Sequence, residues 1–235
     1  MKKYAGKIMR WTLFSLAVLC LFIVCVTPWQ EGEAALTIDP QSVTDWTAVA
    51  QNTVAESGTI TISSNYNTVV HIQAFLDSTT AHTGTEFILQ LSQADSGDEN
   101  WQDFTRWTGL IGTANTEPIT NNPLAAASTT ITCADTGGNY ETPPMAHWIA
   151  IEDSTLANSE LILQTGYTAD TSITCLDGTT NEHAQTTPMY DIADTWVTVL
   201  PLGSGNRARL IVNNTYDADG STLNYKMNEV EVTGL

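Results

Sequence analysis

The sequence predicts an all-β protein: an antiparallel β-sandwich of jelly-roll-like form with a smaller, β-barrel-like domain inserted in it. Apolar and polar residues alternate with a period of two in a series of short segments rich in β-branched residues. Clusters of Gly, Asn, Asp and Ser separate these segments. No long segment shows a helical period. Short strands joined by polar turns are typical of antiparallel sandwiches.

The expected strands run along most of the chain. The segment 68–76 is the clearest, because Val70, Ile72 and Leu76 alternate in it with His71 and Gln73. Further strands are expected at 59–63, 86–92, 101–108, 196–200, 207–212 and 223–232, with turns at 77–84, 95–100 and 217–221. Their period-two alternation is the signal for half-buried strands.

The middle of the chain has a different pattern. Segments 128–135 and 171–177 resemble each other, since each is a Thr/Ile run that ends in Cys-x-Asp. Four prolines punctuate this region. We therefore expect a discontinuous sandwich, formed by 45–122 plus 191–235, and an inserted small β-domain at 123–190. The alternative is one large sandwich with long strands throughout.

The first 34 residues have the pattern of an export signal. Four of the eight basic residues precede an apolar run from Trp11 to Val26, and Gly32 and Ala34 supply the small residues of a cleavage site. The run of 16 residues is short for a spanning helix, which needs about 20. We expect a signal peptide at 1–34 and a secreted or cell-surface protein; a retained membrane anchor is the alternative, and an uncleaved leader is then its sole link to a membrane.

The segment after the expected cleavage site, 35–44, has two interpretations. Its alternating apolar residues up to Pro40 suit a first strand of the chain's own sandwich. The same pattern suits a donor strand that pairs with a neighbouring subunit.

The charge of the chain restricts its partners. The formal net charge is −18, and loss of the leader removes four basic residues and two acids, which gives 4 − 24 = −20. A phosphate backbone needs a basic footprint, so nucleic acid is not an expected partner. Only Arg106, Arg207, Arg209 and Lys226 then remain as basic residues.

Two cysteines, Cys133 and Cys175, remain after the leader. In an oxidising compartment an even pair favours a disulfide. The two similar strands that carry them would have to lie close together. The alternative is two buried thiols; two cysteines alone make a poor zinc site.

Calcium is the cofactor that the sequence allows, and no other is expected. Asp217 and Asp219 flank Ala218 in a Gly-containing turn, and Asp95 and Asp98 lie in a second acidic turn. Carboxylate oxygens are suitable calcium ligands. Asp and Gly also occur in ordinary hairpin turns, which is the alternative interpretation.

Nothing in the pattern indicates catalysis. There is no Gly-x-Ser-x-Gly and no HExxH, and the histidines share no metal-ligand spacing. Two aromatic residues are the candidates for sugar stacking: Trp101 and Trp107 are six residues apart and would share a face of one regular strand. Packing in the core is the alternative for them. Asn213 begins a glycosylation sequon.

Three stretches carry a resemblance to known sequences: Thr80–Phe87, Ser96–Trp101 with Ile111–Ala114, and Asn213–Ser221. They resemble uncharacterised secreted or phage-like β-rich proteins. The middle segment is similar to small β-domains inserted in virion and surface proteins. The resemblance implies a structural or surface class and assigns no chemistry. The leader departs from the virion pattern, because phage structural proteins assemble in the cytoplasm.

Together these features predict a non-enzymatic extracellular structural protein that self-assembles, as a subunit of a surface layer, filament or appendage. The main alternative is a carbohydrate-binding module, with glycans as partners. A secreted hydrolase is a third, less favoured hypothesis.

Overall fold

A computed structural model describes residues 37–62, 67–77, 81–82, 84–97, 100–113, 116–133, 147–201, 203–214 and 222–233. Strands dominate these ranges, and the helical element within them is the short 3₁₀ turn η1 (Leu156–Asn158). The described residues include no helix long and apolar enough to cross a membrane. The leader lies outside the described residues. The predicted all-β class is confirmed.

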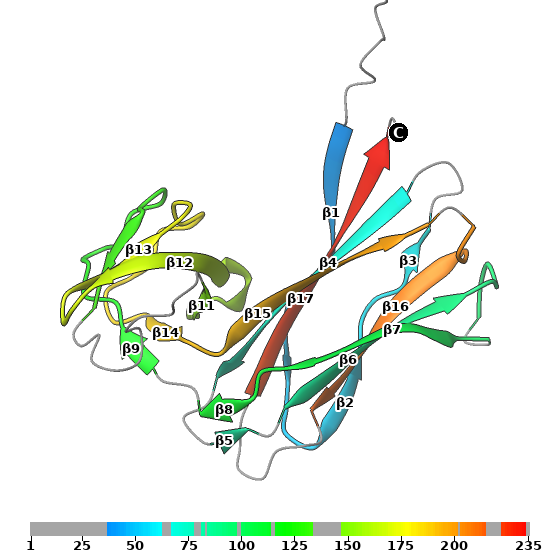
Figure 1. The fold of residues 1–235 in the computed structure, drawn as a ribbon, viewed down its shortest axis with the longest axis horizontal. Helices are drawn as coiled ribbons and strands as arrows, with labels where there is room; N and C mark the ends of the chain where they lie inside the picture. Colours follow the sequence, from blue (N-terminus) through cyan, green and yellow to red (C-terminus); the bar gives the residue numbers. More distant parts are fainter. Residues whose placement is uncertain are drawn as a thin grey trace, which may run out of the picture. The chain divides into compact units, whose positions relative to one another are not determined.

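Two antiparallel sheets form the sandwich (Figure 1). The four-stranded sheet has the order β1-β17-β4-β15, formed by β1 (Thr37–Val49), β17 (Thr222–Thr233), β4 (Asn67–Asp77) and β15 (Ala193–Leu200). The five-stranded sheet has the order β2-β16-β6-β7, formed by β2 (Thr53–Glu56), β16 (Arg207–Asn214), β6 (Thr85–Ser92) and β7 (Gln102–Gly109), with β3 (Ile60–Thr61) also paired to β16. A two-stranded ribbon joins β5 (Ala81–His82) and β8 (Gly112–Thr113).

The strand order is that of a jelly roll. If the eight principal sandwich strands are counted in chain order, one sheet reads 1-8-3-6 and the other reads 2-7-4-5. Successive strands therefore alternate between the sheets except for the β6–β7 hairpin, as in the two Greek keys of a jelly roll. The predicted jelly-roll-like sandwich is confirmed.

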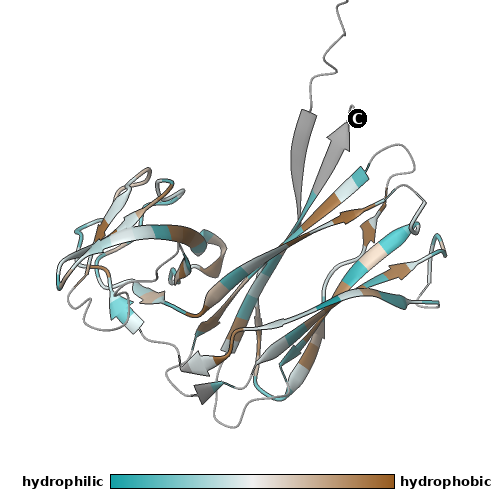
Figure 2. Cartoon of the chain, viewed as in Figure 1, coloured by the Kyte–Doolittle hydropathy of each residue, from teal (hydrophilic) through white to brown (hydrophobic). Residues whose placement is uncertain are grey.

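The sandwich core lies between the two sheets. On β4 the side chains of Thr68, Val70, Ile72 and Ala74 are buried, and those of the intervening positions are half-buried until Phe75. Strands β6 and β16 have the same alternation, which Figure 2 shows as bands of hydrophobic and hydrophilic residues. The core cluster draws on both sheets: Val70, Ile72, Ala74, Leu223, Tyr225 and Met227 from one, and Phe87, Leu89, Leu91, Ala208, Leu210 and Val212 from the other. The period-two pattern thus sets which face each strand buries.

The middle of the chain forms a separate six-stranded sheet rather than an extension of the sandwich. Its order is β10-β13-β12-β11-β14-β9, formed by β9 (Thr116–Pro118), β10 (Thr130–Thr132), β11 (His147–Ile151), β12 (Glu160–Thr168), β13 (Ser172–Cys175) and β14 (Pro188–Tyr190). A bridge between Ile119 and Cys133 joins the two ends of this order. The sheet is therefore barrel-like, as predicted. Its core is apolar and includes Ile131, Ile149, Ile151, Ile162, Ile173 and Met189.

A third apolar cluster joins the barrel-like sheet to the outer face of β4. Phe75 is fully buried and packs against Trp46 and Tyr190, with ring centroids 5.2 and 6.2 Å apart. The indole Nε1 of Trp46 donates to the carbonyl oxygen of Ser159 at 2.5 Å. Residues 37–232 form one compact unit, so the division into a sandwich and an inserted domain stays a prediction. The barrel-like sheet itself begins at β9, before the predicted boundary at 123.

Residues 37–44 of the expected segment 35–44 belong to β1, and residues 35 and 36 lie outside the described residues. This strand pairs with β17 of the same chain and is an edge of its sheet. The chain thus forms this pairing by itself, and donor-strand exchange between subunits stays a prediction.

Candidate functional site

Cys133 and Cys175 are two buried thiols, and no disulfide joins them. The predicted disulfide is wrong because of the strand direction. Strands β10 and β13 pair antiparallel, with Ile131 opposite Ile173. Cys133 lies just beyond the end of β10, and Cys175 lies at the end of β13. Because the two strands run in opposite directions, these cysteines lie at opposite ends of the ladder. Four residues at about 3.4 Å each separate such positions by roughly 14 Å, whereas a disulfide needs Cα atoms less than about 7 Å apart. Burial, with a contribution from the Glu160 charge, raises the pKa of the Cys175 thiol to about 12.

Trp101 and Trp107 lie on opposite faces of the five-stranded sheet, so the prediction that they share a face is wrong. Trp107 is opposite Phe87 and packs on the sandwich core. A register shift between Leu89 and Gln90 leaves Phe104 as an extra residue in β7. Because a bulge of this kind adds one residue, the side chains beyond it point to the opposite face of the sheet. The pair therefore makes no joint platform for a sugar ring.

Trp101 instead belongs to a polar network on the outer face of the five-stranded sheet. The guanidinium groups of Arg207 and Arg209 lie over its ring, 4.9 and 4.3 Å from the centroid. Arg209 also donates to Glu56 at 2.5 Å and to Gln90 at 2.9 Å. The two guanidinium groups thus cover the Trp101 ring on this face.

Most of the predicted calcium residues lie outside the described residues, namely Asp98, Asp217 and Asp219. Asp95 is exposed and accepts a hydrogen bond from the Asn206 amide at 2.8 Å. Within the ranges described, no three His, Cys, Asp or Glu side chains form a group that would hold a metal ion. Calcium at the two turns stays a prediction.

Asn213 lies inside β16, between β2 and β6, and its amide donates to Glu86 at 3.5 Å. Glycosylation at this position stays a prediction.

His183 is fully buried between two carboxylates. Its Nδ1 lies 3.3 Å from Asp153 Oδ2, and its Nε2 lies 2.6 Å from Glu160 Oε1. Glu160 also accepts the backbone N–H groups of Thr180 and Asn181 at 2.6 and 3.2 Å. The three side chains thereby fasten the segment before β12 to the 180–183 turn.

The pKa values in this network move in opposite directions. Burial alone would lower the pKa of His183, but Glu160 and Asp153 outweigh it and the pKa is raised. Burial alone would raise the pKa of Glu160, but hydrogen bonds from His183 and the backbone lower it. Each shift favours the charged form, so the network acts as a buried ion triad.

A second polar cluster lies where β4, β11 and β14 come together. The Tyr190 hydroxyl hydrogen-bonds to Asp77 and Glu152. Burial, followed by the Asp77 charge, raises the pKa of Glu152, although the bond from Tyr190 opposes this. Burial and the two carboxylates likewise raise the pKa of Tyr190. The carboxylates of Asp77 and Glu152 therefore bring negative charge together where burial limits contact with water.

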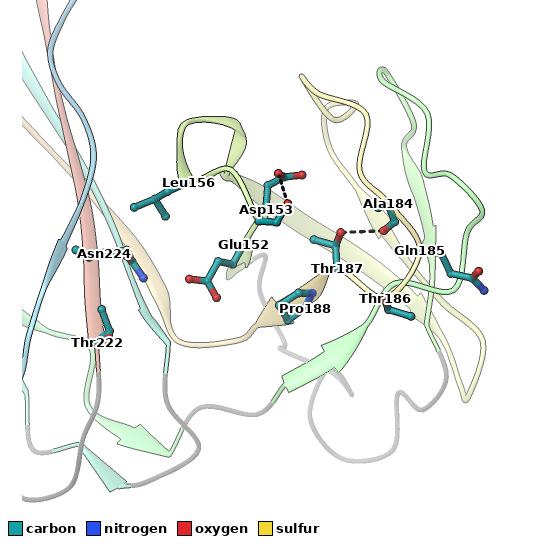
Figure 3. A pocket seen from close by; sticks show the side chains of 12 residues that line it. Glu152, Asp153, Leu156, Ala184, Gln185, Thr186, Thr187, Pro188, Thr222 and Asn224 are labelled. Carbon is teal, nitrogen blue, oxygen red and sulfur yellow. Dashed lines mark hydrogen bonds between the residues drawn. The ribbon is translucent and has the colours of Figure 1, made fainter.

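A pocket of about 480 Å³ adjoins both clusters (Figure 3). Its wall includes Glu152 and Asp153 from the segment after β11, Thr187 and Pro188 at the start of β14, and Thr222 and Asn224 from β17. Asn224 is only 1% exposed and its Nδ2 has no hydrogen-bond partner. Figure 3 shows its amide directed into the pocket toward Glu152.

Sequence reasoning did not find this pocket. Glu152 and Asn224 are far apart in the chain, and β17 and the end of β11 meet only through the fold. The His183 triad likewise joins residues 23 and 30 positions apart, with no local motif. Polar residues also stand at Lys226 and Asn228 of β17, so no signal in the sequence set Asn224 apart.

No protein-family model and no curated protein sequence matches this chain. Among solved structures, it is similar to a chain of infectious bursal disease virus, Gt strain, at 6% identity and a TM-score of 0.25, over 85% of this chain and 42% of that one. It is also similar to VP17, a capsid protein of bacteriophage P23-77, at 9% identity and a TM-score of 0.19, over 84% and 97% of the two chains. The chain thus spans about two fifths of the length of the bursal disease virus chain. These TM-scores do not establish a shared fold.

Proposed function

We propose that this protein is a non-enzymatic structural subunit that assembles with further copies of itself at the open edge of β15. The observation that carries the proposal is the exposure of two valines on this strand. Val197 is 61% exposed and Val199 is 52% exposed. Both are β-branched residues on an edge strand, which is the arrangement that recruits another strand.

The valines belong to an apolar strip on the outer face of the four-stranded sheet. Val199 is opposite Val69, which is half-buried, and Val197 is opposite His71. The strip therefore continues from β15 onto β4.

The edge of β15 has little of the protection that monomeric proteins use. Its second residue is Asp194, and Pro201 follows its last residue, but the stretch from Trp196 to Leu200 has no charge, proline or bulge. In the described part of the chain, no strand pairs with the side of β15 that faces away from β4. Backbone groups there are available for pairing with a second copy.

The net charge of the chain makes the proposed assembly depend on salt concentration. Chains with a formal charge of −18 repel one another, and salt screens this repulsion beyond about 10 Å at 0.1 M. We therefore expect assembly to increase with ionic strength.

The extracellular location is part of the proposal and depends on the leader pattern. N-terminal sequencing of the protein from the culture medium is its test. A mature terminus near Ala35 supports export with cleavage, and an intact leader contradicts it.

The test of assembly compares the wild-type chain with the double variant Val197→Lys, Val199→Lys. We expect ultracentrifugation and negative-stain electron microscopy in 0.5–1 M NaCl, roughly the range in which charge is well screened, to show oligomers or polymers for the wild type and monomers for the variant. Leu176→Lys is the matched control, because Leu176 is 60% exposed but lies in a turn beyond β13. Monomers for the wild type, or equal assembly by both variants, would contradict the proposal.

A further inference from the structure

We propose that the pocket between Glu152 and Asn224 binds a divalent cation of the calcium type, held by the Glu152 carboxylate, the Asn224 amide oxygen and water. This site differs from the two acidic turns that the sequence indicated. It is independent of the proposed assembly.

The first support is the balance of charge around the pocket. Glu152 and Asp153 line it, and Asp77 shares the Tyr190 hydroxyl with Glu152. His183 is the one cation in contact with these groups in the described residues, and it already lies between Asp153 and Glu160. A half-buried carboxylate with a like charge beside it is stabilised by a bound cation.

The basic residues do not supply that cation. Arg106, Arg207 and Arg209 lie on the five-stranded sheet and bind partners there. Lys226 lies two residues after Asn224 on β17 but is not part of the pocket wall. The charge of Glu152 therefore has no basic partner in the wall.

The second support is Asn224. A buried amide with no hydrogen bond at Nδ2 destabilises the folded chain, so such a group needs an explanation. A rotation of 180° exchanges the amide nitrogen and oxygen, and no hydrogen bond of Nδ2 opposes it. The amide then presents an oxygen to the space that Glu152 also faces (Figure 3).

The third support is the character of the wall. Thr222 is opposite Asp77 in the β4–β17 ladder and lines the pocket beside Asn224, so hydroxyl and amide oxygens lie along one strand. Calcium accepts six to eight such oxygens, with irregular geometry and with water completing the shell. The volume of about 480 Å³ leaves room for that water. A site with so few charged ligands falls among weak calcium sites, with Kd of about 0.1–1 mM.

The test is calorimetric titration of the chelator-treated full chain with CaCl₂ at constant ionic strength. We expect one site per chain, and a rise of roughly 5–10 °C in Tm when free calcium is about 100 times Kd. Glu152→Gln should weaken binding at least tenfold, and Asn224→Asp should strengthen it about tenfold through the added charge. Melting curves without calcium establish that each variant is folded.

A matched control separates this pocket from the acidic turns. The variant Asp95→Asn, Asp98→Asn, Asp217→Asn, Asp219→Asn should keep the binding heat. Loss of the heat in that variant together with its survival in Glu152→Gln would overturn the proposal. Absence of any calcium heat in the wild type, or no change in Kd for Asn224→Asp, would overturn it as well.

Discussion

The outer faces of the two sandwich sheets differ in how they meet solvent. On the five-stranded sheet, three arginines bind carboxylates or backbone carbonyls, and two of them cover Trp101. On the four-stranded sheet, Val197 and Val199 are exposed with no such cover. Both sheets bury the same kind of apolar inner face. Two arginines thus cover an aromatic ring on one outer face, whereas two valines of an edge strand meet solvent on the other.

The largest expected effect is at His183, the buried counterpart of the exposed arginine network. His183→Ala leaves Asp153 and Glu160 as buried charges without their shared partner, and we expect a loss of about 3–5 kcal/mol in the free energy of unfolding. Urea denaturation measures it. A loss below about 1 kcal/mol would show that the triad does not behave as a buried ion network.

The same triad predicts a pH dependence. The raised pKa of His183 gives stability that is full below about pH 6.5 and is lost as the pH rises through the folded-state value. The lowered pKa of Glu160 gives stability that is present above about pH 4.5 and is lost as the pH falls through its folded-state value. The difference in unfolding free energy between wild type and His183→Ala should thus be greatest near pH 5–6.

Trp101→Ala should produce the next largest change. The ring is half-buried beneath Arg207 and Arg209, so its loss should lower the free energy of unfolding by about 1–3 kcal/mol. Assembly in high salt should be unchanged, because this face is not the proposed interface. A folded Trp101→Ala variant that no longer assembles would remove the distinction between the two faces.

His71 lies opposite Val197 on the outer face of the four-stranded sheet, so a change of pH tests the part of that face proposed for assembly. Burial lowers the pKa of His71, so the neutral side chain is favoured there and protonation is resisted. As the pH falls below about 6.5, the unfolded chain binds this proton first and the folded form loses stability. Light scattering should show weaker assembly at pH 5.5 than at pH 7.5 relative to His71→Gln, in which this contribution is missing. The use of that reference cancels the general loss of negative charge at low pH.

Arg106→Ala should have the smallest effect. Arg106 and Asp103 have half-exposed side chains, and Glu86, which is 12% exposed, keeps its hydrogen bond from the Asn213 amide, so hardly any shift in Tm is expected. The hydrogen bond from Gln90, and after it Arg106, lowers the pKa of Asp103. Titration by NMR should therefore show the Asp103 pKa rise in the variant while the melting curve stays the same.

The strand pattern predicted the fold because burial in a sandwich depends on alternation within each strand. Val70 and Ile72 already show that alternation in the sequence. The site residues depend on pairing between distant strands, which alternation does not encode. The direction of β10 against β13 separated Cys133 from Cys175, and one extra residue in β7 put Trp101 and Trp107 on opposite faces. Asn224 gained its neighbours only when β17 met the end of β11.

The position of the barrel-like sheet between β7 and β15 has a consequence for the order in which the chain folds. The six strands of this sheet, from Thr116 to Tyr190, follow one another in the chain. By contrast, β4 cannot pair with β15, in which Trp196 lies opposite Ile72, until the whole of that segment has been made. During synthesis, therefore, every barrel strand is present before β15, β16 and β17 of the jelly roll have been made. Early formation of the barrel shortens the effective loop that β15 must close, and a smaller loop costs less entropy. Although the barrel-like sheet interrupts the sandwich in the sequence, its early formation thus lowers the entropic cost of pairing β15 with β4.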